Sequence, residues 1–565
     1  MPSQKLSALN GDSQSRVRSD RSTVSQLIEM FALPEEMVEL LLETQTDQSE
    51  KEIRLSSTRI AEELIWLSSF KNGNQSESDE ILRAVRLGYH AGYLLKNPNG
   101  LSNLRDENLL EGLHEICNSF TPTTTLQRLL LLCEIPLLRL GMQTGTSCHL
   151  AEGQAIIDSM TSIVIDDFDG EGMLVSSELS DFAEVLASTS RIVQIVNMLS
   201  GVPPLPELIS NHFQWSVRQF LLICMGDGRL FGGTGNLVNS VFVELLLKLG
   251  GDPSDVRLAQ SLGLRSGSAG EFASPLVVKA RRPRSAFHSE WAQIAILRSG
   301  WGRKRRELAV CVNGTQLEVA LQAGGNRVLQ GQIESILEVE GVCVEPTGTW
   351  IETCWQSDND ADYLEMELEM DDGWRIQRQF CVSRRSGAVL LADVVLGSAP
   401  SDVRHTLQVA TSISNAKFSV VGEGRELLVD TENFSSLVLP VGLSEWRADR
   451  SVGMTGELTG TNGLKLVSNG EQVSALYCPL FFALTPKSAD KQFTWRQLVV
   501  GNELAPEQQD QAAAARIQVG GRQWLLYRSL AEQANRTFMG QNYASEFVFG
   551  EFLLDGKLKP YVDIS

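Results

Sequence analysis

Two different periods of hydrophobic residues divide the chain into two parts. From about residue 23 to 265, apolar residues recur at three- and four-residue spacing, as at Ile60, Leu64 and Leu67, which is the period of amphipathic helices. Short breakers such as Gly201-Val-Pro-Pro separate these stretches, and short connections favour antiparallel neighbouring helices. This part therefore predicts either a bundle-like array or a closed ring of helical hairpins.

The apolar period changes to two after a linker rich in Ser, Gly, Pro and Arg at 266–286. Over 363–370, Leu and Met residues alternate strictly with three glutamates, so the apolar side chains share one face of a half-buried strand and the glutamates share the other. Asp372-Gly373 then turns the chain into 374–380, which is a strong hairpin signal. Similar short runs continue to the C-terminus, so residues 287–565 predict a large antiparallel β-sandwich.

The composition is that of a folded protein, and its charge limits the partners. Apolar residues make up 42% and charged residues 21% of the 565 residues, which are ordinary globular values. Residues 1–22, rich in Ser, Arg and Gln without periodicity, predict a disordered tail. With 49 Lys and Arg against 70 Asp and Glu, the formal net charge is -21. We therefore expect no nucleic-acid partner, because phosphate binding needs a basic face.

Cysteine usage and the N-terminal residues indicate a reducing compartment. The nine cysteines contain no C-x-x-C pair, and most stand in apolar runs, where a reduced Cys acts as a small hydrophobe. The N-terminal residues lack the apolar stretch of a signal peptide. The most apolar stretch, at 129–140, is too short and too often interrupted to span a membrane. We expect a cytoplasmic protein with no membrane partner, and the sequence is compatible with a homo-oligomer.

One acidic segment nearly satisfies the spacing of a calcium-binding loop. Asp167, Asp169, Glu171 and Glu178 stand at positions 1, 3, 5 and 12, with Gly172 at position 6, and oxygen ligands at this spacing suit calcium. The glutamate at position 5 departs from the usual pattern. The alternative is an acidic turn between helices, with a serine capping the next helix. The sequence therefore predicts no cofactor, with calcium at this loop as the alternative.

Four segments, in chain order over about residues 160–410, carry a resemblance to a known family. They are Asp169-Gly-Glu-Gly172 before a helix, Met225-Gly-Asp-Gly-Arg-Leu-Phe-Gly-Gly-Thr-Gly235, Trp291-Ala-Gln-Ile-Ala-Ile-Leu-Arg298, and Trp374-Arg-Ile-Gln-Arg-Gln-Phe380 followed by Leu390-Leu-Ala-Asp393. Together they resemble the heparinase II/III family of (α/α)-toroid polysaccharide lyases, as a divergent member. The resemblance implies an N-terminal (α/α) helical toroid at 23–265 followed by a large C-terminal antiparallel β-sandwich at 287–565. It also implies a carbon–oxygen lyase that cleaves an acidic, uronate-containing polysaccharide by β-elimination in the groove between the domains.

The residue types that this chemistry needs are only partly present. Such a lyase must neutralise the uronate carboxylate and hold a base and an acid within hydrogen-bond reach. The family uses an Asn and a Tyr from the toroid and a His from an early sandwich strand. The corresponding stretch at 318–329 contains no histidine, and no tyrosine stands between Tyr93 and Tyr363. The catalytic residues are therefore unassigned, with Asn236 after the glycine-rich segment and His288 at the start of the sandwich as the remaining candidates.

A local reversal of charge marks the candidate substrate-binding residues. Nine basic residues fall within the 28 positions from 279 to 306, and arginine binds carboxylate and sulfate through two parallel hydrogen bonds. The candidates are Arg281, Arg282, Arg284 and Arg298 in this segment, with Asn326 and Arg327 in the place of the missing histidine motif. The alternative is a solvated linker and hairpin with polar turn residues.

The sequence leaves two hypotheses for function. In the first, the protein binds, or still cleaves, an acidic polysaccharide or oligosaccharide. In the second, the lyase fold survives as a catalytically inactive scaffold or interaction protein.

Overall fold

The computed structural model describes the helical part from residue 77 onward and most of the strand-rich part. The described residues are 77–95, 107–142, 149–199, 201–233, 237–264, 277, 279–410, 417–420, 424–431, 434–447, 454–460, 463–485, 488–502 and 505–565. The tail predicted at 1–22, the helical pattern before residue 77 and most of the linker predicted at 266–286 lie outside them.

Contacts divide the described residues into two units. The helical unit holds those up to Gly172 together with Asp181–Ser216 and Lys248–Gly250. The strand unit holds Met173–Ser180, Val217–Leu247 and Gly251–Ser565. Among the described residues, no helix is both long enough and apolar enough to cross a bilayer.

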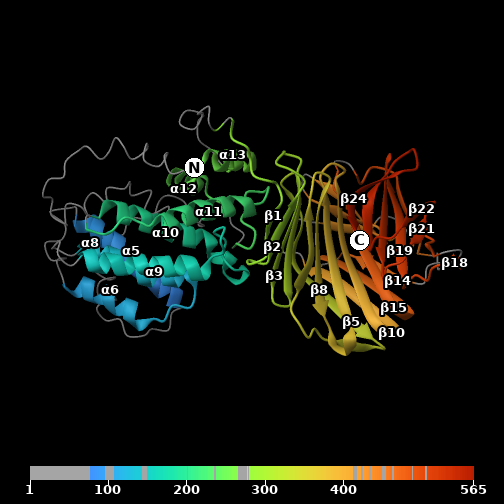
Figure 1. Ribbon diagram of the computed structural model, residues 1–565, viewed down its shortest axis with the longest axis horizontal. Coiled ribbons are helices and arrows are strands. Elements are labelled where there is room, and N and C mark those ends of the chain that lie inside the picture. The colour runs from blue at the N-terminus through green and yellow to red at the C-terminus, as the bar shows by residue number, and fades with distance from the viewer. Residues whose placement is uncertain are drawn as a thin grey trace. The chain divides into compact units, whose positions relative to one another are not determined.

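Helices make up the regular structure of the helical unit (Figure 1), which confirms the helical period there. They are α5 (Glu77–Leu95), α6 (Glu107–Ser119), α7 (Thr125–Leu129), the π-helical turn η1 (Leu130–Glu134), α8 (Ile135–Met142), α9 (His149–Asp167), α10 (Phe182–Met198) and the first part of α11 (Glu207–Ile223). The π-helical turn stands between α7 and α8 without a break and carries a buried acid, Glu134.

Glu134 ties three segments of the helical unit together. Its carboxylate accepts hydrogen bonds from the Tyr89 hydroxyl at 2.9 Å and from the Ser188 hydroxyl at 2.6 Å. Arg191 donates to it through Nε at 2.5 Å and Nη2 at 2.9 Å. Because a buried charge is tolerated only when it is paired and hydrogen-bonded, this cluster holds α5, the π-helical turn and α10 in one arrangement.

The strand unit is dominated by antiparallel strands (Figure 1), as the period of two predicted. Its helical elements are η2 (Ser176–Asp181, of which the last residue belongs to the helical unit), the end of α11, α12 (Ser240–Gly250, of which the last three residues belong to the helical unit), α13 (Pro253–Leu262) and η3 (Asp371–Gly373). The first nine strands are β1 (Phe287–Ser289), β2 (Ile294–Arg298), β3 (Arg306–Asn313), β4 (Gln316–Ala323), β5 (Asn326–Val339), β6 (Val342–Val344), β7 (Ile351–Ser357), β8 (Ala361–Glu369) and β9 (Arg375–Ser383).

Six further strands complete the main sheet, and nine build two smaller sheets. The former are β10 (Ala388–Ala410), β11 (Lys417–Val420), β12 (Leu427–Asp430), β13 (Ser435–Pro440), β14 (Met454–Thr459) and β15 (Gly463–Ala483). The latter are β16 (Phe493–Leu498), β17 (Gly501–Asn502), β18 (Ala505–Pro506), β19 (Ala512–Val519), β20 (Arg522–Ser529), β21 (Arg536–Phe538), β22 (Gln541–Tyr543), β23 (Phe547–Phe552) and β24 (Leu558–Ile564).

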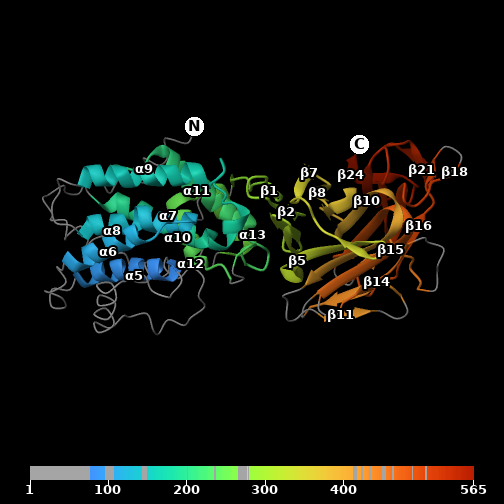
Figure 2. The same cartoon turned by 90° about the horizontal axis from the view of Figure 1, so that it is seen from below.

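The long strand β10 belongs to both layers of the main sheet. Its first part, 388–396, pairs with β9, and its second part, 403–409, pairs with β5. Irregular register against β15 falls between these two parts, and Figure 2 shows β10 and β15 lying side by side. The sheet therefore folds over on itself and encloses a core between its two layers. The layer with β5 contributes Leu297, Val319 and Leu407 to this core, and the layer with β9 contributes Leu364 and Phe380.

The hairpin predicted at Asp372-Gly373 is confirmed. β8 and β9 pair in antiparallel register from Ala361↔Ser383 to Glu369↔Arg375. Asp372 and Gly373 both adopt positive φ, at 57° and 74°, which is the conformation that Asp and Gly tolerate best in a tight turn.

The prediction that all three glutamates of β8 face away from buried structure is wrong for Glu365. Glu369 is exposed and Glu367 half-buried, but Glu365 is buried and hydrogen-bonded to Gln379 at 2.9 Å and Arg528 at 3.2 Å. The cause is an additional layer, because the sheet of β16, β19, β20, β23 and β24 packs over this face of the main sheet. The small sheet of β17, β18, β21 and β22 adds the core around Tyr527 and Phe538.

A second buried ion-pair cluster lies inside the main sheet. Asp393 on β10 accepts from Arg378 Nε at 2.7 Å and Nη2 at 2.8 Å, and from the Ser335 hydroxyl at 3.1 Å. His405 Nε2 lies 3.1 Å from the same carboxylate, and none of the three charged side chains is exposed. Burial by itself would lower the pKa of His405, but the contacts with Asp393 and Cys478 outweigh it and raise the pKa to about 9.

Candidate functional site

The glycine-rich segment that carries part of the resemblance forms a tight loop after α11, which we call the glycine loop (224–233). Met225 N–H donates to the Arg229 carbonyl at 2.8 Å, and Gly228 N–H donates to the Met225 carbonyl at 3.0 Å. Gly228 has a φ of 81°, which glycine adopts without steric cost. The loop therefore directs the N–H groups of Gly226 and Asp227 toward strands β3 and β4, where they find acceptors.

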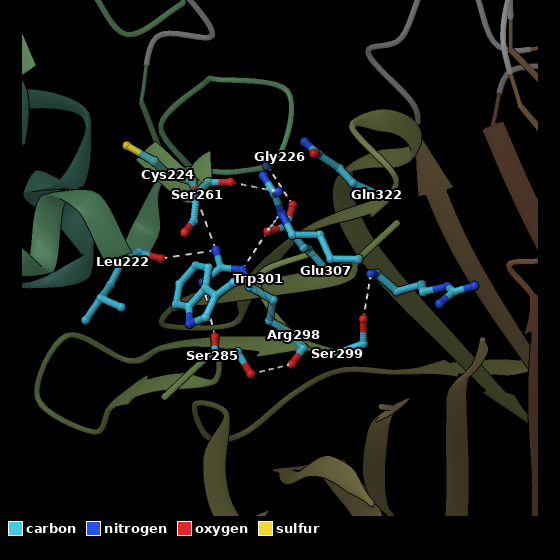
Figure 3. A network of polar contacts seen from close by, with 12 residues as sticks. Leu222, Cys224, Gly226, Ser261, Ser285, Arg298, Ser299, Trp301, Glu307 and Gln322 are labelled. Carbon is cyan, nitrogen blue, oxygen red and sulfur yellow. Dashed lines mark hydrogen bonds and ion pairs between the residues drawn. The ribbon is translucent and has the colours of Figure 1, made fainter. Parts of the chain in front are cut away.

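Glu307 on β3 is the centre of this contact (Figure 3). Its carboxylate accepts from Gly226 N–H at 2.6 Å, from Arg298 Nε at 2.5 Å and from Arg305 Nε at 2.8 Å. A Cβ on Gly226 would lie 2.5 Å from Glu307 Oε2, so only glycine allows this approach. The hypothesis from the sequence missed Glu307, because a glutamate in an apolar strand run carries no signal of its partners.

Arg298 was a candidate for substrate binding, and its position corrects that hypothesis. Its side chain has no exposed surface, and its Nη2 donates to the carbonyls of Leu222 and Cys224 at 3.2 and 3.1 Å. Its Nη1 donates to the Ser285 carbonyl at 3.1 Å. Burial lowers the pKa of the Arg298 guanidinium, and Glu307 opposes that effect. All the strong donors of Arg298 are thus directed into the protein interior, and none faces an open surface.

The β4–β5 hairpin, where the resemblance predicted a histidine, holds the glycine loop in place. Asp227 N–H donates to Gln322 Oε1 at 3.1 Å, and the Asp227 carboxylate forms an ion pair with Arg327. A Cβ on Gly325 would lie 3.1 Å from the Gly226 carbonyl oxygen, so the backbones of the hairpin and of the glycine loop pass close to each other. Arg327, a predicted binding residue, therefore contributes to the packing of the loop on the β4–β5 hairpin.

Asn326, the other candidate in this hairpin, borders an open pocket of about 520 Å³, which we call the first basic pocket. Its cationic lining residues are Arg303, Lys304 and Arg306, its polar ones include Asn326, Thr431 and Ser435, and Asp490 supplies a carboxylate. Arg303 and Lys304 are exposed in the turn before β3. The charge run in the sequence indicated the arginines, but Thr431 and Ser435 stand more than a hundred positions away and gave no signal of belonging to the same site.

Arg306 is fixed in the wall of this pocket. Its Nε donates to the Leu484 carbonyl at 2.9 Å, and its N–H donates to the Ser299 hydroxyl at 2.9 Å. Burial, followed by the charge of Arg522, lowers the pKa of the Arg306 guanidinium. Arginine is not deprotonated in proteins, so Arg306 presents a fixed positive charge.

The linker arginines are exposed but do not line the pocket. Arg281, Arg282 and Arg284 are all exposed, and Arg282 Nη1 donates to the Ser261 hydroxyl at 3.1 Å. The linker backbone is held by Trp301, whose Nε1 donates to the Pro283 carbonyl at 3.0 Å. The structure thus brings Asn326 together with the cations of the β2–β3 turn and not with those at 281–284.

His288, a candidate base, forms a pair with a carboxylate on another strand. Its Nε2 lies 2.5 Å from Glu352 Oε2 on β7, and its ring stacks on Trp355 with centroids 4.7 Å apart. The two paired side chains are 20% and 26% exposed, so solvent reaches them. Neither lines the first basic pocket. Asn236, the other candidate, lies outside the described residues.

The acidic segment with calcium-like spacing has partners among protein groups. Asp167 forms an ion pair with Arg128, and Asp169 Oδ1 accepts from Glu171 N–H at 2.8 Å. Glu178 lies in η2. In the part of the chain that the structure describes, no three His, Cys, Asp or Glu side chains are placed to hold a metal ion together. Calcium at this loop stays a prediction.

Comparison with solved structures places the fold. One heparinase III structure aligns with a TM-score of 0.56 at 12% identity, covering 89% of this chain and 81% of its own. A second heparinase III structure aligns with a TM-score of 0.52 at 9% identity, covering 90% and 98%. This chain has the heparinase III fold. A heparan sulfate lyase, HepC from Pedobacter heparinus, aligns at 0.48 with 11% identity, covering 88% and 89%.

The sequence comparisons find no relative. No family model matches the chain, and no curated protein matches it either. The likeness to the heparinase III fold is therefore one of structure, at an identity where the roles of single residues do not transfer.

Proposed function

We propose that this protein binds an acidic, uronate-containing polysaccharide at the first basic pocket. The observation that carries the proposal is the pocket itself, in which the exposed Arg303 and Lys304 and the fixed charge of Arg306 surround a concave surface. The Asn326 amide and the Thr431 and Ser435 hydroxyls add the donors and acceptors that sugar hydroxyls need. The heparinase III fold supports this choice of ligand class.

Cleavage by β-elimination is a second candidate, favoured by the His288–Glu352 pair. A base would remove the uronate C5 proton, the C4–O bond would break with its electrons going to the leaving oxygen, and that oxygen would take up a proton. An imidazole held by a carboxylate can move a proton in this way. Binding is the stronger proposal, because Gln322 and Arg327 fill the segment of the missing histidine and are engaged in packing.

The remaining expectations from the sequence belong to this proposal. They are a toroid at 23–265, a linker at 266–286 and a sandwich at 287–565. Cytoplasmic residence, the absence of a nucleic-acid or membrane partner, and binding through Arg281, Arg282 and Arg284 likewise stay predictions. An inactive scaffold remains the alternative from another functional class.

The binding proposal predicts weaker retention of one variant on immobilised heparin. Arg303→Glu with Lys304→Glu reverses two exposed charges at the pocket and should lower affinity roughly tenfold or more, because charge-assisted contacts to sulfate and carboxylate are lost. Salt elution from the column and calorimetric titration with a heparin oligosaccharide measure the loss. The control reverses Arg404 and Lys465, which are exposed on β10 and β15 away from the pocket lining. Equal retention of both variants and the native protein would contradict the proposal.

Incubation with a panel of uronate polymers separates binding from cleavage. If the protein only binds, the ultraviolet absorbance of the unsaturated sugar product stays at the level of a blank for every polymer. A rise that disappears in His288→Ala, while heparin retention is unchanged, would establish β-elimination and assign the base to this histidine. A rise that persists in that variant would place the base elsewhere.

A further inference from the structure

A second basic pocket, of about 250 Å³, lies in the strand unit at the turns that lead into β10 and β20. Its lining includes three exposed cations, Arg385, Lys491 and Arg522, with the hydroxyl-bearing Ser386 and Thr485. Lys491 Nζ contacts the Thr485 hydroxyl at 3.4 Å. Arg522 has a long ion pair of 3.9 Å with Glu551, in which its own side chain is 49% exposed. Positive charge therefore exceeds negative charge around this cavity.

The two basic pockets share a wall. Leu484 lines the first and the next residue, Thr485, lines the second. Arg306 of the first pocket donates to the Leu484 carbonyl, and its Nη2 lies 3.0 Å from the position that a Cβ on Gly387 would take. Gly387 lines the second pocket and has a φ of 77°. The guanidinium of Arg306 therefore reaches the border of both cavities.

The charges of Arg306 and Arg522 interact across this shared wall. After burial, the charge of Arg522 is what lowers the pKa of Arg306, so the guanidinium groups on the two sides of the wall repel each other. Like charges held close in a folded protein cost free energy, and an anion between them removes that cost.

We propose that the two pockets form one continuous anion-binding track, in which Arg306 stands between positions for successive sulfate or carboxylate groups of an extended acidic oligosaccharide. This inference rests on the proposed function and deepens it, since it concerns the length of glycan that the site accepts. In the track, a short oligosaccharide occupies the first basic pocket, and a longer one continues past Arg306 to Arg385, Lys491 and Arg522.

The test compares chain lengths by calorimetric titration with a heparin disaccharide and a long heparin oligosaccharide. The second-pocket variant carries Arg385→Glu and Arg522→Glu, the first-pocket variant carries Arg303→Glu and Lys304→Glu, and the control carries Arg404→Glu and Lys465→Glu. The track requires that the second-pocket variant lose roughly tenfold or more in affinity for the long chain and keep the native affinity for the disaccharide. The first-pocket variant should lose affinity for both ligands.

The outcomes separate the two proposals. Native affinity of the second-pocket variant for the long chain overturns the track and leaves the proposed function standing. Failure of the native protein to bind either ligand overturns the proposed function, and the track with it. An equal loss for both lengths in the second-pocket variant also overturns the track, because the short ligand would then occupy that pocket. The neutral pair Arg385→Gln and Arg522→Gln, checked by circular dichroism, gives the same comparison if charge reversal impairs folding.

Discussion

Replacing Glu307 by alanine is expected to lower the free energy of unfolding of the strand unit by about 3–5 kcal/mol, the usual cost of removing one partner from a buried ion pair. The carboxylate accepts from two guanidinium groups and one backbone N–H, and both it and Arg298 are fully buried. Its loss leaves the charges of Arg298 and Arg305 without a counterion. Urea unfolding followed by tryptophan fluorescence measures the change.

Two further variants test whether the buried charge of Glu307 is the cause of this loss of stability. Glu307→Gln keeps an acceptor oxygen but removes the charge. Its free energy of unfolding should therefore be higher than that of the alanine variant but still well below that of the native protein. Glu334→Gln on β5 is the control, because Glu334 is exposed and surface changes of this kind cost about 0.5 kcal/mol or less. A Glu307→Ala protein that unfolds at the native urea concentration would show that the cluster does not support the glycine loop.

Asp393→Asn is expected to cost a similar amount, about 3–5 kcal/mol, and to change how stability depends on pH. The carboxylate pairs with Arg378 and lies 3.1 Å from His405 Nε2. Burial alone would raise the pKa of Asp393, but Arg378 and His405 hold that pKa well below its usual range. The asparagine leaves the buried Arg378 without its counterion and removes the main support of the charged form of His405.

The sign of the pH effect follows from the raised pKa of His405. The folded-state pKa of about 9 lies above the ordinary value of 6.5, so the folded protein binds a proton more tightly than the unfolded chain does. The stabilisation is fully present below pH 6.5 and is lost as the pH rises through 9. In Asp393→Asn this fall between pH 6.5 and 9 should flatten.

Urea unfolding at several pH values tests this prediction. Asp563→Asn, at an exposed position on β24, is the control and should keep the native pH profile. If Asp393→Asn retained the full native decline in stability above pH 6.5, the carboxylate would not be what keeps His405 charged.

Local pattern was sufficient for strand β8 and the β8–β9 hairpin. Alternation over 363–370 and the Asp372-Gly373 pair predicted a strand and a hairpin, and both are present, because side-chain period and turn conformation depend on neighbouring residues alone. Local pattern could not place Glu365, since the sheet that covers it comes from more than a hundred residues further along the chain. Periodicity describes which residues share a face, and not what packs on that face.

The same limit applies to the candidate site. The run of nine basic residues at 279–306 was plain in the sequence, yet its members have different roles. Arg298 and Arg305 are buried against Glu307, whereas Arg303 and Lys304 are exposed beside the first basic pocket. Adjacent arginines look identical in a sequence, and only the position of a buried carboxylate distinguishes those that stabilise the fold from those that can meet a ligand.

The sequence by itself determined the helical and strand-rich parts, the β8–β9 hairpin, the resemblance to a lyase family and the absence of a histidine at 318–329. These depend on residue type and short-range spacing, which the chain carries directly. The tertiary structure alone decided that the glycine loop rests on Glu307, that Arg327 pairs with Asp227, and that residues from 303 to 524 meet in two adjoining basic pockets. Such contacts join residues far apart in the chain, and their energies depend on burial and distance, which only the folded chain defines.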